Sequence, residues 1–591
     1  MPNLTKRLLL YAHYDRDGRV DEHILHQLTA FAPHCREIRF VSNSPITAAD
    51  GQRLNAIVTA YRDRPNHGYD FAAWQTALEE CDERLKDFDE VILMNSSCYG
   101  PLFPLEELWQ KMASVTCDFW GITRHPGTRG IPPHLQSYFL VIRRSMATSN
   151  AFREFWERAV PRCRSHADTV RFGEIAFSTE MEQAGFHGRA LIETEDLREN
   201  WSIGYTHPLA VHAADRLIVN YRLPLLKVKA FAKFRNRQTS SGAEIIRALN
   251  RSGSNYPLPL LERHLRRTTP LSWQKNLPST LILTSPEDSP PPHRCRTSRV
   301  AVFLHVYYLD LLPEMFYALS RLPAPFDLYL TTPHPQLEEK LSLFTIPPQA
   351  NINLRVTPNC GRDIAPWLNA ISPEQHLSYD VALKLHTKKS PTVTSEFGNR
   401  WREFLLQALL PSSEGVDRLL HAFADDPELG LILPPWPPVV TLQCPAAYLG
   451  SAADSALARQ LLDRLRLAPP GETDQPIFSA GSMFYYRPAA IAPLLQAGLD
   501  YTTFPAEPLP EVGTIAHAIE RLIPYIAQSN SYTYRQTMTL EMLQDAFRTC
   551  EDRSTYHYTT VYRSMRELYH AVRNSIRWRT GISRGDQWPT V

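Results

Sequence analysis

Two short motifs contain the polar residues whose types and spacing could support chemistry. They read NHGYDFAAW at residues 66–74 and NCGRDIAPW at residues 359–367. The aspartate of each motif could receive a sugar or ribose hydroxyl, or it could cap the helix that follows, through the N–H groups of that helix. The glycine suits a position with positive φ, or one where a ligand approaches the backbone closely. The predicted contacts are Asn66, Gly68 and Asp70 in the first motif and Asn359, Gly361 and Asp363 in the second.

Cationic side chains gather after the second motif, in and just beyond the segment YDVALKLHT at 379–387. Cations at the end of a strand can neutralise phosphate oxygens, and arginine can do so with two parallel hydrogen bonds. Alternation along a strand would place the first lysine and the histidine on the same face. A solvated basic loop is the alternative. The residues predicted to contact phosphate are Lys384, His386, Lys388 and Lys389, with Arg362 from the motif and Arg402 from GNRWREF.

The corresponding position after the first motif offers neutral groups. Asn95 and Ser96 end the apolar segment DEVILMNSS at 89–97, and their amide and hydroxyl groups suit sugar hydroxyls. The two halves therefore differ in charge at matching positions.

The elements that position these residues occur twice, in the same order. Each half begins with an apolar run that ends near a histidine, His13 or His305, and the distance from this histidine to the motif agrees to within one residue. Helical periodicity follows each run, and a strand-like segment precedes each motif. The matched segments are 7–14 with 299–306, 38–45 with 328–335, 89–97 with 379–387, 117–123 with 429–435, 137–144 with 482–488, and 173–186 with 513–526. This order predicts an internal duplication.

Alternating strand and helix patterns predict an α/β fold with mixed sheets covered by helices. In such sheets ligands bind beyond the carboxyl ends of the strands, which is where both strand-end histidines and both polar segments lie. The histidines could therefore contact a nucleotide base, or they could be hydrogen-bonded structural residues. The predicted boundaries are 1–221 for the first domain, 222–298 for a basic and Pro-rich linker, 299–530 for the second domain, and 531–591 for a helical basic tail.

The sequence resembles the bacterial rhamnan synthesis protein F family. The resemblance rests on NHGYDFAAW, LMNSSCYGPL, DFWGIT, SYFLVIRRS, NCGRDIAPW, LKLHTKKS and GTIAHAIERL, which together extend over most of the chain outside the linker and tail. It implies two tandem nucleotide-sugar-binding domains of the GT-A (Rossmann-like) type and a rhamnosyltransferase activity in cell-surface polysaccharide assembly. Enzymes of this type hold a divalent metal on a DxD motif, but this chain has Asn95-Ser96-Ser97 and Leu385-His386-Thr387 in the two slots. We therefore predict no metal cofactor and expect cations to replace the ion.

The resemblance also implies an acidic residue late in each domain, at a helix start. Glu174 occupies this place in the first half, and Asp118 is an alternative. Glu507 or Glu511 precedes the matching helix of the second half, and His517 lies within it. The predicted catalytic residues are Glu174, Glu511 and His517.

Composition excludes several other classes of protein. The chain has 591 residues, of which 43% are hydrophobic and 21% charged, and a net charge of +1, so no global field favours nucleic acid. Nine scattered cysteines without a CxxC pair fit a reducing compartment and predict neither a disulfide framework nor a zinc site. No segment is long and apolar enough for a signal peptide or a membrane span, so a cytoplasmic protein is expected. The basic linker and tail could dock on the inner face of the plasma membrane, or they could be solvated packing helices.

The predicted function is transfer of a deoxysugar, rhamnose from dTDP-rhamnose, to a lipid-linked glycan of a rhamnan or a lipopolysaccharide O-antigen. Two hypotheses remain for the halves: both are catalytic, or the second half binds the nucleotide-sugar while the first binds an acceptor or is a different transferase. The difference in charge favours an active second half.

The alternative is a non-catalytic glycan-binding or scaffolding protein of the same pathway, which the absence of DxD motifs favours.

Overall fold

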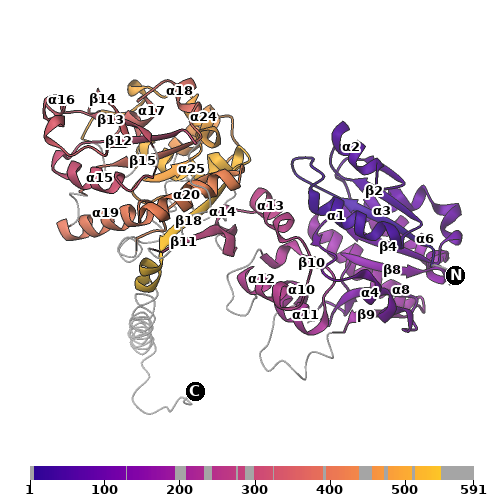
Figure 1. Cartoon of the computed structure of the whole chain (residues 1–591). Coiled ribbons are helices and arrows are strands. Elements are labelled where there is room, and N and C mark those ends of the chain that lie inside the picture. The colour runs from indigo at the N-terminus through magenta and orange to yellow at the C-terminus, as the bar shows by residue number, and fades with distance from the viewer. Residues whose placement is uncertain are drawn as a thin grey trace, which may run out of the picture. The chain divides into compact units, whose positions relative to one another are not determined.

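The computed structural model forms two compact units, Met1–Pro278 and Ser279–Val591. We describe each unit by itself, with the labels of Figure 1. The structure describes residues 5–127, 130–193, 208–231, 242–274, 277–285, 298–323, 325–389, 394–437, 456–470, 477–508 and 513–546.

The first unit is built on a mixed sheet with the strand order β3-β2-β1-β4-β8-β6-β7, with β9 also paired to β6 (Figure 1). Strands β1 to β4 are parallel, β8 runs antiparallel to both β4 and β6, and β9 is parallel to β6. A separate small ladder pairs β5 with β10. The strands are β1 (Arg7–His13), β2 (Glu37–Ser42), β3 (Ala60–Asp63), β4 (Glu90–Asn95), β5 (Cys98–Tyr99), β6 (Phe119–His125), β7 (His134–Leu135), β8 (Phe139–Arg143), β9 (Gly188–Ile192) and β10 (Leu226–Lys227).

Helices cover both faces of this sheet because β1 is apolar on both sides. Leu9 and Tyr11 belong to one buried cluster, with residues of α1, α4 and α10 to α13, whereas Leu8 and Leu10 belong to another, with residues of α3, α6 and α8. The helices are α1 (Glu22–Phe31), α2 (Ala48–Asn55), α3 (Tyr69–Glu79), α4 (Leu105–Ala113), α5 (Arg144–Ala147), α6 (Asn150–Ala159), α7 (His166–Asp168), α8 (Ala176–Gln183), α10 (Leu209–His212), α11 (Ala214–Tyr221), α12 (Gly242–Arg251), α13 (Leu258–Thr268) and α14 (Leu271–Gln274). A π-helical segment, Thr169–Ile175, leads directly into α8.

In its described residues, the second unit repeats seven strands of the first sheet, lacks a counterpart of β7, and has an additional edge strand, β11. Its order is β11-β18-β16-β17-β15-β12-β13-β14, and β17 alone runs antiparallel to its neighbours β15 and β16. The strands are β11 (Leu281–Thr284), β12 (Val300–His305), β13 (Phe326–Thr332), β14 (Ala350–Val356), β15 (Val381–His386), β16 (Leu429–Leu433), β17 (Phe484–Tyr486) and β18 (Thr533–Thr539). The helices are α15 (Leu312–Leu319), α16 (Leu337–Lys340), α17 (Ile364–Leu368), α18 (Pro373–Leu377), α19 (Ser395–Leu409), α20 (Ser413–Asp425), α23 (Ala456–Arg464), α24 (Ala492–Leu495) and α25 (Ile515–Ser529).

The strand orders confirm the predicted duplication and the predicted α/β class. Reading β3-β2-β1-β4-β8-β6-β9 against β14-β13-β12-β15-β17-β16-β18 matches every strand in position and direction. Each predicted segment pair falls on an equivalent strand or helix. Four strands are not predicted from the apolar pattern: β3, β14, β9 and β18. Of these, β3 and β14 are edge strands whose residues are mostly exposed or half-buried, so they lack a clear apolar alternation.

The tryptophan that ends each motif is a packing residue. Trp74 donates from Nε1 to the carbonyl of Met94 at 3.0 Å, and Trp367 donates to the hydroxyl of Tyr486 at 2.8 Å. Both rings are buried. They attach each motif helix to the central strands of its own sheet.

The predicted linker is part of the two units. Residues of 223–231 and of α12 and α13 belong to the same buried cluster as β1, and the first unit ends at Pro278. Beyond it, β11 pairs with β18, which places the start of the predicted tail inside the second sheet. In the described part of the basic and apolar stretch, 222–231, the apolar residues Leu223, Leu225, Leu226, Ala230 and Phe231 are buried. The arginines of the tail, from Arg563 onward, lie outside the described residues.

In the part of the chain that the structure describes, none of the helices combines the length and the apolar character that crossing a lipid bilayer demands.

Candidate functional site

The strand-end histidines are held by hydroxyl groups of the neighbouring strand. Nδ1 of His13 lies 2.9 Å from Oγ of Ser42, and Nδ1 of His305 lies 3.1 Å from Oγ1 of Thr331. Burial lowers the pKa of His13 to about 4 and that of His305 to about 3, so both rings are neutral at pH 7. This geometry favours the structural interpretation of the two histidines.

Each motif forms a left-handed turn at the start of its helix. Gly68 has φ of 72° and Gly361 has φ of 65°, and the next residues, Tyr69 and Arg362, also have positive φ of 53° and 54°. Two successive left-handed residues are uncommon for L-amino acids. This turn directs the aspartate that follows it toward the central strands, where Asp70 contacts Asn95 and Asp363 contacts Lys384.

Replacing Gly68 by alanine is expected to destabilise the first unit by about 1–2 kcal/mol, because the left-handed conformation is strained for any L side chain. A Cβ at this position would also lie 2.7 Å from the Cβ of Ala72. Urea denaturation of the purified chain measures the change. Gly185→Ala is the matched control, since Gly185 has φ of 93° but open space around its Cβ position. Equal losses in both variants would show that the close approach to Ala72 has no effect.

Asp70 is the carboxylate that the first motif contributes to the site. Its Oδ2 accepts a hydrogen bond of 2.8 Å from Nδ2 of Asn95, at the end of β4. Burial raises the pKa of Asp70 to about 6, with a further increase from the charge of Glu174, while Asn95 and the charges of Lys227 and Lys229 oppose the shift. Asp70 is therefore ionised at pH 7 and basic enough to accept a proton.

Two lysines reach this site from the segment predicted as a linker. Lys227 ends β10, which pairs with β5 directly after β4, and its ammonium lies 4.7 Å from the centre of the Tyr138 ring. Nζ of Lys229 lies 3.3 Å from Nε2 of His166. The charges of both lysines act on Asp70. The contrast between a neutral first half and a cationic second half is thus wrong: the cations of the first unit lie far away in sequence.

Glu174 lies in the π-helical segment before α8, and it is attached to the start of the antiparallel strand. Its Oε2 accepts hydrogen bonds from the backbone N–H of Ser137 at 2.8 Å and from the Ser137 hydroxyl at 2.7 Å. His134 lies 3.7 Å from Oε1. Burial alone would raise the pKa of Glu174, but His134, the charge of Lys227 and the Ser137 donors lower it to about 2. Such a carboxylate keeps its charge at neutral pH and is a weak proton acceptor.

In the second unit the motif aspartate is paired with a lysine. Nζ of Lys384 contacts Oδ2 of Asp363, and it also donates to the carbonyl of Ser482 at 2.8 Å and to its hydroxyl at 2.9 Å. Lys384 is 0% exposed. Burial opposes ionisation of Asp363, but the charges of His386 and Lys384 outweigh it and hold the pKa of Asp363 well below its usual range. An ammonium group has three N–H donors, and these three contacts engage all of them. Lys384 therefore does not fit the predicted role of phosphate ligand.

The residues around this pair complete a second polar cluster. Nε2 of His386 lies 2.8 Å from the carbonyl of Gly481, and burial lowers the pKa of His386 to about 4. The Gly481 N–H donates to Oε1 of Glu520 at 3.1 Å. Burial lowers the pKa of Lys388, whose ammonium lies 4.0 Å from the centre of the Trp401 ring and interacts with the charge of Glu520. Glu520 is not among the residues predicted for the site, and only its contact with the segment before β17 reveals its place there.

The other residues predicted for the second half are mostly held by neighbours. Lys389 pairs with Asp310 at 2.5 Å, and the buried Arg402 pairs with Glu314 at 3.0 Å and donates to the Lys388 carbonyl at 3.0 Å. Arg402 therefore fixes the loop after β15 and does not fit a phosphate ligand.

His517 does not fit the predicted role of catalytic base. Its Nε2 lies 3.2 Å from a guanidinium nitrogen of Arg362 and its Nδ1 lies 2.7 Å from the Thr514 hydroxyl, so both ring nitrogens are engaged. Glu511 lies outside the described residues.

The three other predicted contacts are Asn66, Asn359 and Ser96. Asn66 and Asn359 are exposed. Ser96 accepts a hydrogen bond of 3.3 Å from the N–H of Tyr14 and lies beside Asn95 at the end of β4.

The two units thus assemble similar groups from different parts of the sequence. Each has the motif aspartate, a glutamate that accepts from the backbone just before the antiparallel strand, and two lysines. They differ in the partner of the aspartate, which is the neutral Asn95 in the first unit and the charged Lys384 in the second. The first unit therefore has the more basic carboxylate.

The divalent metal of a GT-A enzyme would need carboxylates at the DxD position after the central strand of each unit, and the residues found there do not fit such a metal. The slots hold Asn95 and Ser96 in one unit and Leu385 and His386 in the other. Among the described residues, the group with suitable metal-ligand spacing is Asp21, His23 and His264, away from both slots in sequence.

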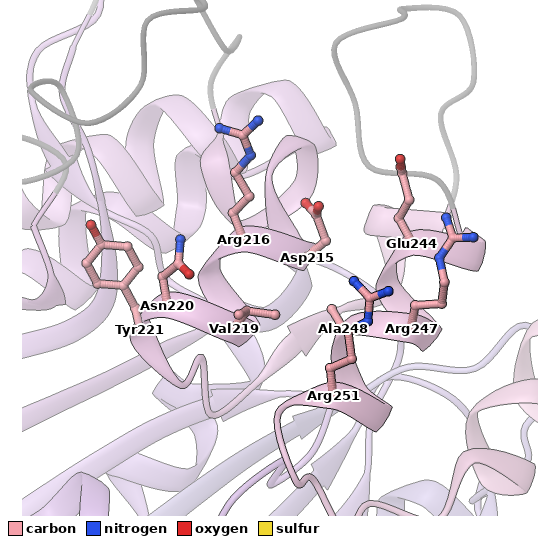
Figure 2. Close-up of a pocket in the computed structure, with 9 residues that line it drawn as sticks. All are labelled: Asp215, Arg216, Val219, Asn220, Tyr221, Glu244, Arg247, Ala248 and Arg251. Atoms are coloured by element: carbon pink, nitrogen blue, oxygen red, sulfur yellow. The ribbon is translucent and has the colours of Figure 1, made fainter.

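A surface pocket of about 860 Å³ lies away from these residues. Figure 2 shows it between α11 and α12, lined by Arg216, Arg247 and Arg251 among others, and none of the predicted site residues line it.

Comparison with known proteins gives a family match along most of the chain. The model of the rhamnan synthesis protein F family matches residues 38–532. A stretch of 226 residues, 38% of this chain, is 34% identical to "Uncharacterized protein WxcX" of Xanthomonas campestris pv. campestris (strain B100) and covers 30% of it. A stretch of 159 residues, 27% of this chain, is 24% identical to "Uncharacterized protein y4gN" of Sinorhizobium fredii and covers 41% of it. The matched stretches thus span less than half the length of these curated relatives.

Among solved structures, the glycosyltransferase GlyE of Streptococcus pneumoniae TIGR4 aligns with 65% of this chain and 86% of its own, at 14% identity and a TM-score of 0.24. Core-mannan synthase A of Aspergillus fumigatus aligns with 30% of this chain and 69% of its own, at 8% identity and a TM-score of 0.19. At these values neither likeness supports an argument.

Proposed function

This chain belongs to the rhamnan synthesis protein F family, and from this premise we propose that it is a glycosyltransferase of cell-surface polysaccharide synthesis. The proposed donor is a nucleotide-activated deoxysugar, dTDP-rhamnose, and the proposed acceptor is a lipid-linked glycan at the inner face of the plasma membrane. The observation that carries the proposal is the cluster of Asp70, Glu174, Lys227 and Lys229 at the carboxyl end of β4.

The groups of the first unit suit the three tasks of a sugar transfer. Lys227 and Lys229 supply positive charge for the leaving diphosphate, which requires cations where no metal is held. Asp70 accepts the proton of the acceptor hydroxyl, because its pKa of about 6 is close to the working pH. Glu174 remains negative and stabilises positive charge that develops on the sugar. The amide of Asn95 orients Asp70.

For the second unit we propose a binding role. Its aspartate is neutralised by Lys384, so it lacks a comparable base, while Arg362 and Lys388 offer charge to a phosphate or an anionic sugar. A wholly non-catalytic, glycan-binding protein remains the rival hypothesis, favoured by this closed pair.

The proposal predicts that the purified chain binds a nucleotide-sugar through the first unit. Screening dTDP-, UDP- and GDP-sugars by thermal shift, with and without manganese, identifies the donor. The double variant Lys227→Ala/Lys229→Ala should weaken its binding by about 10²- to 10⁴-fold, because it removes two charge-assisted hydrogen bonds that contribute roughly 1.5–3 kcal/mol each.

Lys111→Ala, an exposed lysine of α4, is the matched control and should bind like the wild type. Lys388→Ala/Lys389→Ala tests the second unit. Loss of binding in this variant alone would move the donor site to the second unit, and glycan binding without any nucleotide-sugar binding would support the non-catalytic rival.

A further inference from the structure

Three potential metal ligands of the first unit converge although they are distant in sequence. Atoms of Asp21, His23 and His264 all lie within 4.8 Å of one another. Nε2 of His264 is 3.8 Å from Oδ2 of Asp21, and the two imidazole rings have centroids 4.2 Å apart. Zinc bonds of about 2.0–2.2 Å in a tetrahedron separate ligand atoms by roughly 3.3–3.6 Å, so a small closure would suffice.

His23 has an unusual environment for a buried polar residue. Its side chain is 2% exposed, and neither ring nitrogen has a hydrogen-bond partner among the residues that the structure describes. Buried polar groups are nearly always paired, since leaving one unpaired costs about 1–3 kcal/mol. The unpaired ring faces Asp21 and His264, which are the residues that would share an ion with it.

His264 is oriented as a metal ligand. Its Nδ1 lies 2.6 Å from the hydroxyl of the buried Tyr99. When Nδ1–H donates to this hydroxyl, the lone pair of Nε2 points toward Asp21. Ligating histidines commonly use the second ring nitrogen in this way, which fixes both the tautomer and the ring orientation.

The charge around the three residues favours a cation. Arg267 bridges Asp15, Asp17 and Asp21, with a distance of 2.6 Å to Oδ2 of Asp21. Arg16 also pairs with Asp17, at 3.4 Å. Three carboxylates against these two guanidinium groups leave one surplus negative charge. The same bridge holds Asp21 in place beside the two rings.

We propose that Asp21, His23 and His264 bind a divalent transition-metal ion of the zinc class, which fastens α13 to the start of α1. Asp21 precedes α1, His23 lies in its first turn, and His264 lies on α13, which packs against α1. Two imidazoles and one carboxylate are a common zinc ligand set that leaves a fourth position for water. The ion would therefore cross-link residues near the N-terminus of the unit with the helical segment that follows β10.

The test is a metal titration of the full-length chain, without any sugar, so that its outcome is independent of the proposed transfer reaction. After removal of metal with a chelator, Zn²⁺ is titrated against a chromophoric competitor, and Co²⁺ binding is followed by visible absorption. The wild type should bind one ion per chain with a rise in melting temperature. His23→Gln and His264→Gln should each lose this ion, whereas His26→Gln, on the same helix but outside the group, should retain it.

Retention of the ion by both histidine variants would overturn the proposal, as would the absence of tight binding by the wild type. Circular dichroism of the metal-free proteins shows whether each variant is folded. Tyr99→Phe keeps all three ligands, so it tests metal binding even if a histidine variant does not fold. It should weaken Zn²⁺ affinity by about 10- to 100-fold, and unchanged affinity would contradict the proposed geometry.

Discussion

Replacing Asp70 by asparagine is expected to lower kcat for sugar transfer by about 10²- to 10⁴-fold, the usual contribution of a positioned general base. Asparagine has the same shape, and its side-chain oxygen can still accept the hydrogen bond from Asn95, so the chain should remain folded. The binding of the donor should change little, because the base acts on the acceptor hydroxyl. Steady-state kinetics with the donor identified by thermal shift measures both effects.

The pH dependence of the wild type provides a second measurement on the same residue. Asp70 must be ionised to accept a proton, and its pKa is about 6. The value of kcat should therefore fall tenfold for each pH unit below about 6 and level off above it. Glu174→Gln should reduce kcat on the order of 10²-fold by removing a fixed charge. The acidic limb should persist, since the pKa of Glu174 is about 2, but it should move to lower pH because the charge of Glu174 helps to raise the pKa of Asp70.

Asp89→Asn is the control for both measurements. Asp89 lies just before β4, at the opposite end of the strand from Asn95, and accepts from the N–H of Lys6 at 2.7 Å. This variant should transfer sugar like the wild type. If Asp70→Asn retains kcat within threefold, or if the wild type shows no acidic limb between pH 5 and 8, then Asp70 is not the base.

Replacing Lys384 by methionine is expected to destabilise the second unit by about 3–5 kcal/mol. Lys384 is fully buried and is the cation that contacts the buried Asp363, so its loss leaves a carboxylate without a charge partner. Urea denaturation of the full chain measures the loss of stability as a shift of the unfolding midpoint. Because the chain has two units, it can unfold in more than one transition, and the shift is read from the transition of the second unit.

Two further variants show whether charge pairing is the cause. Lys389→Met removes an exposed partner of Asp310, with side chains 39% and 63% exposed, and should change stability by less than about 1 kcal/mol. Asp363→Asn/Lys384→Met removes both buried charges and should recover much of the stability. If the double variant is as unstable as Lys384→Met, the loss comes from packing rather than from an unpaired charge.

Much of the fold could be predicted because its signals are local. Apolar runs such as 7–14 and 299–306, the helices after them and the repeated motifs all depend on residues that are close in sequence. Their order gave the α/β class and the duplication, which the strand orders confirm. The motif turns were foreseeable too, since glycine at Gly68 and Gly361 permits the positive φ that both show.

The assembly of the clusters could not be predicted, because each one joins distant parts of the chain. Lys227 and Lys229 were assigned to a linker, since nothing near them in sequence indicates that β10 pairs with β5 beside the end of β4. Conversely, the sequence predicts Lys384 as a phosphate ligand because a strand-end lysine is ordinarily solvated, whereas Ser482 and Asp363 enclose it in the structure.

The number of α/β units, the order of their elements and the location of polar residues at strand ends follow from the amino-acid sequence, because periodicity and turn chemistry act over a few residues. Which charges are paired and which carboxylates remain basic depends on tertiary packing. The pKa values of Asp70, Glu174 and Asp363 depend on burial and on partners such as Asn95 and Ser137. The same holds for the group of Asp21, His23 and His264, whose members meet only when α13 packs against α1.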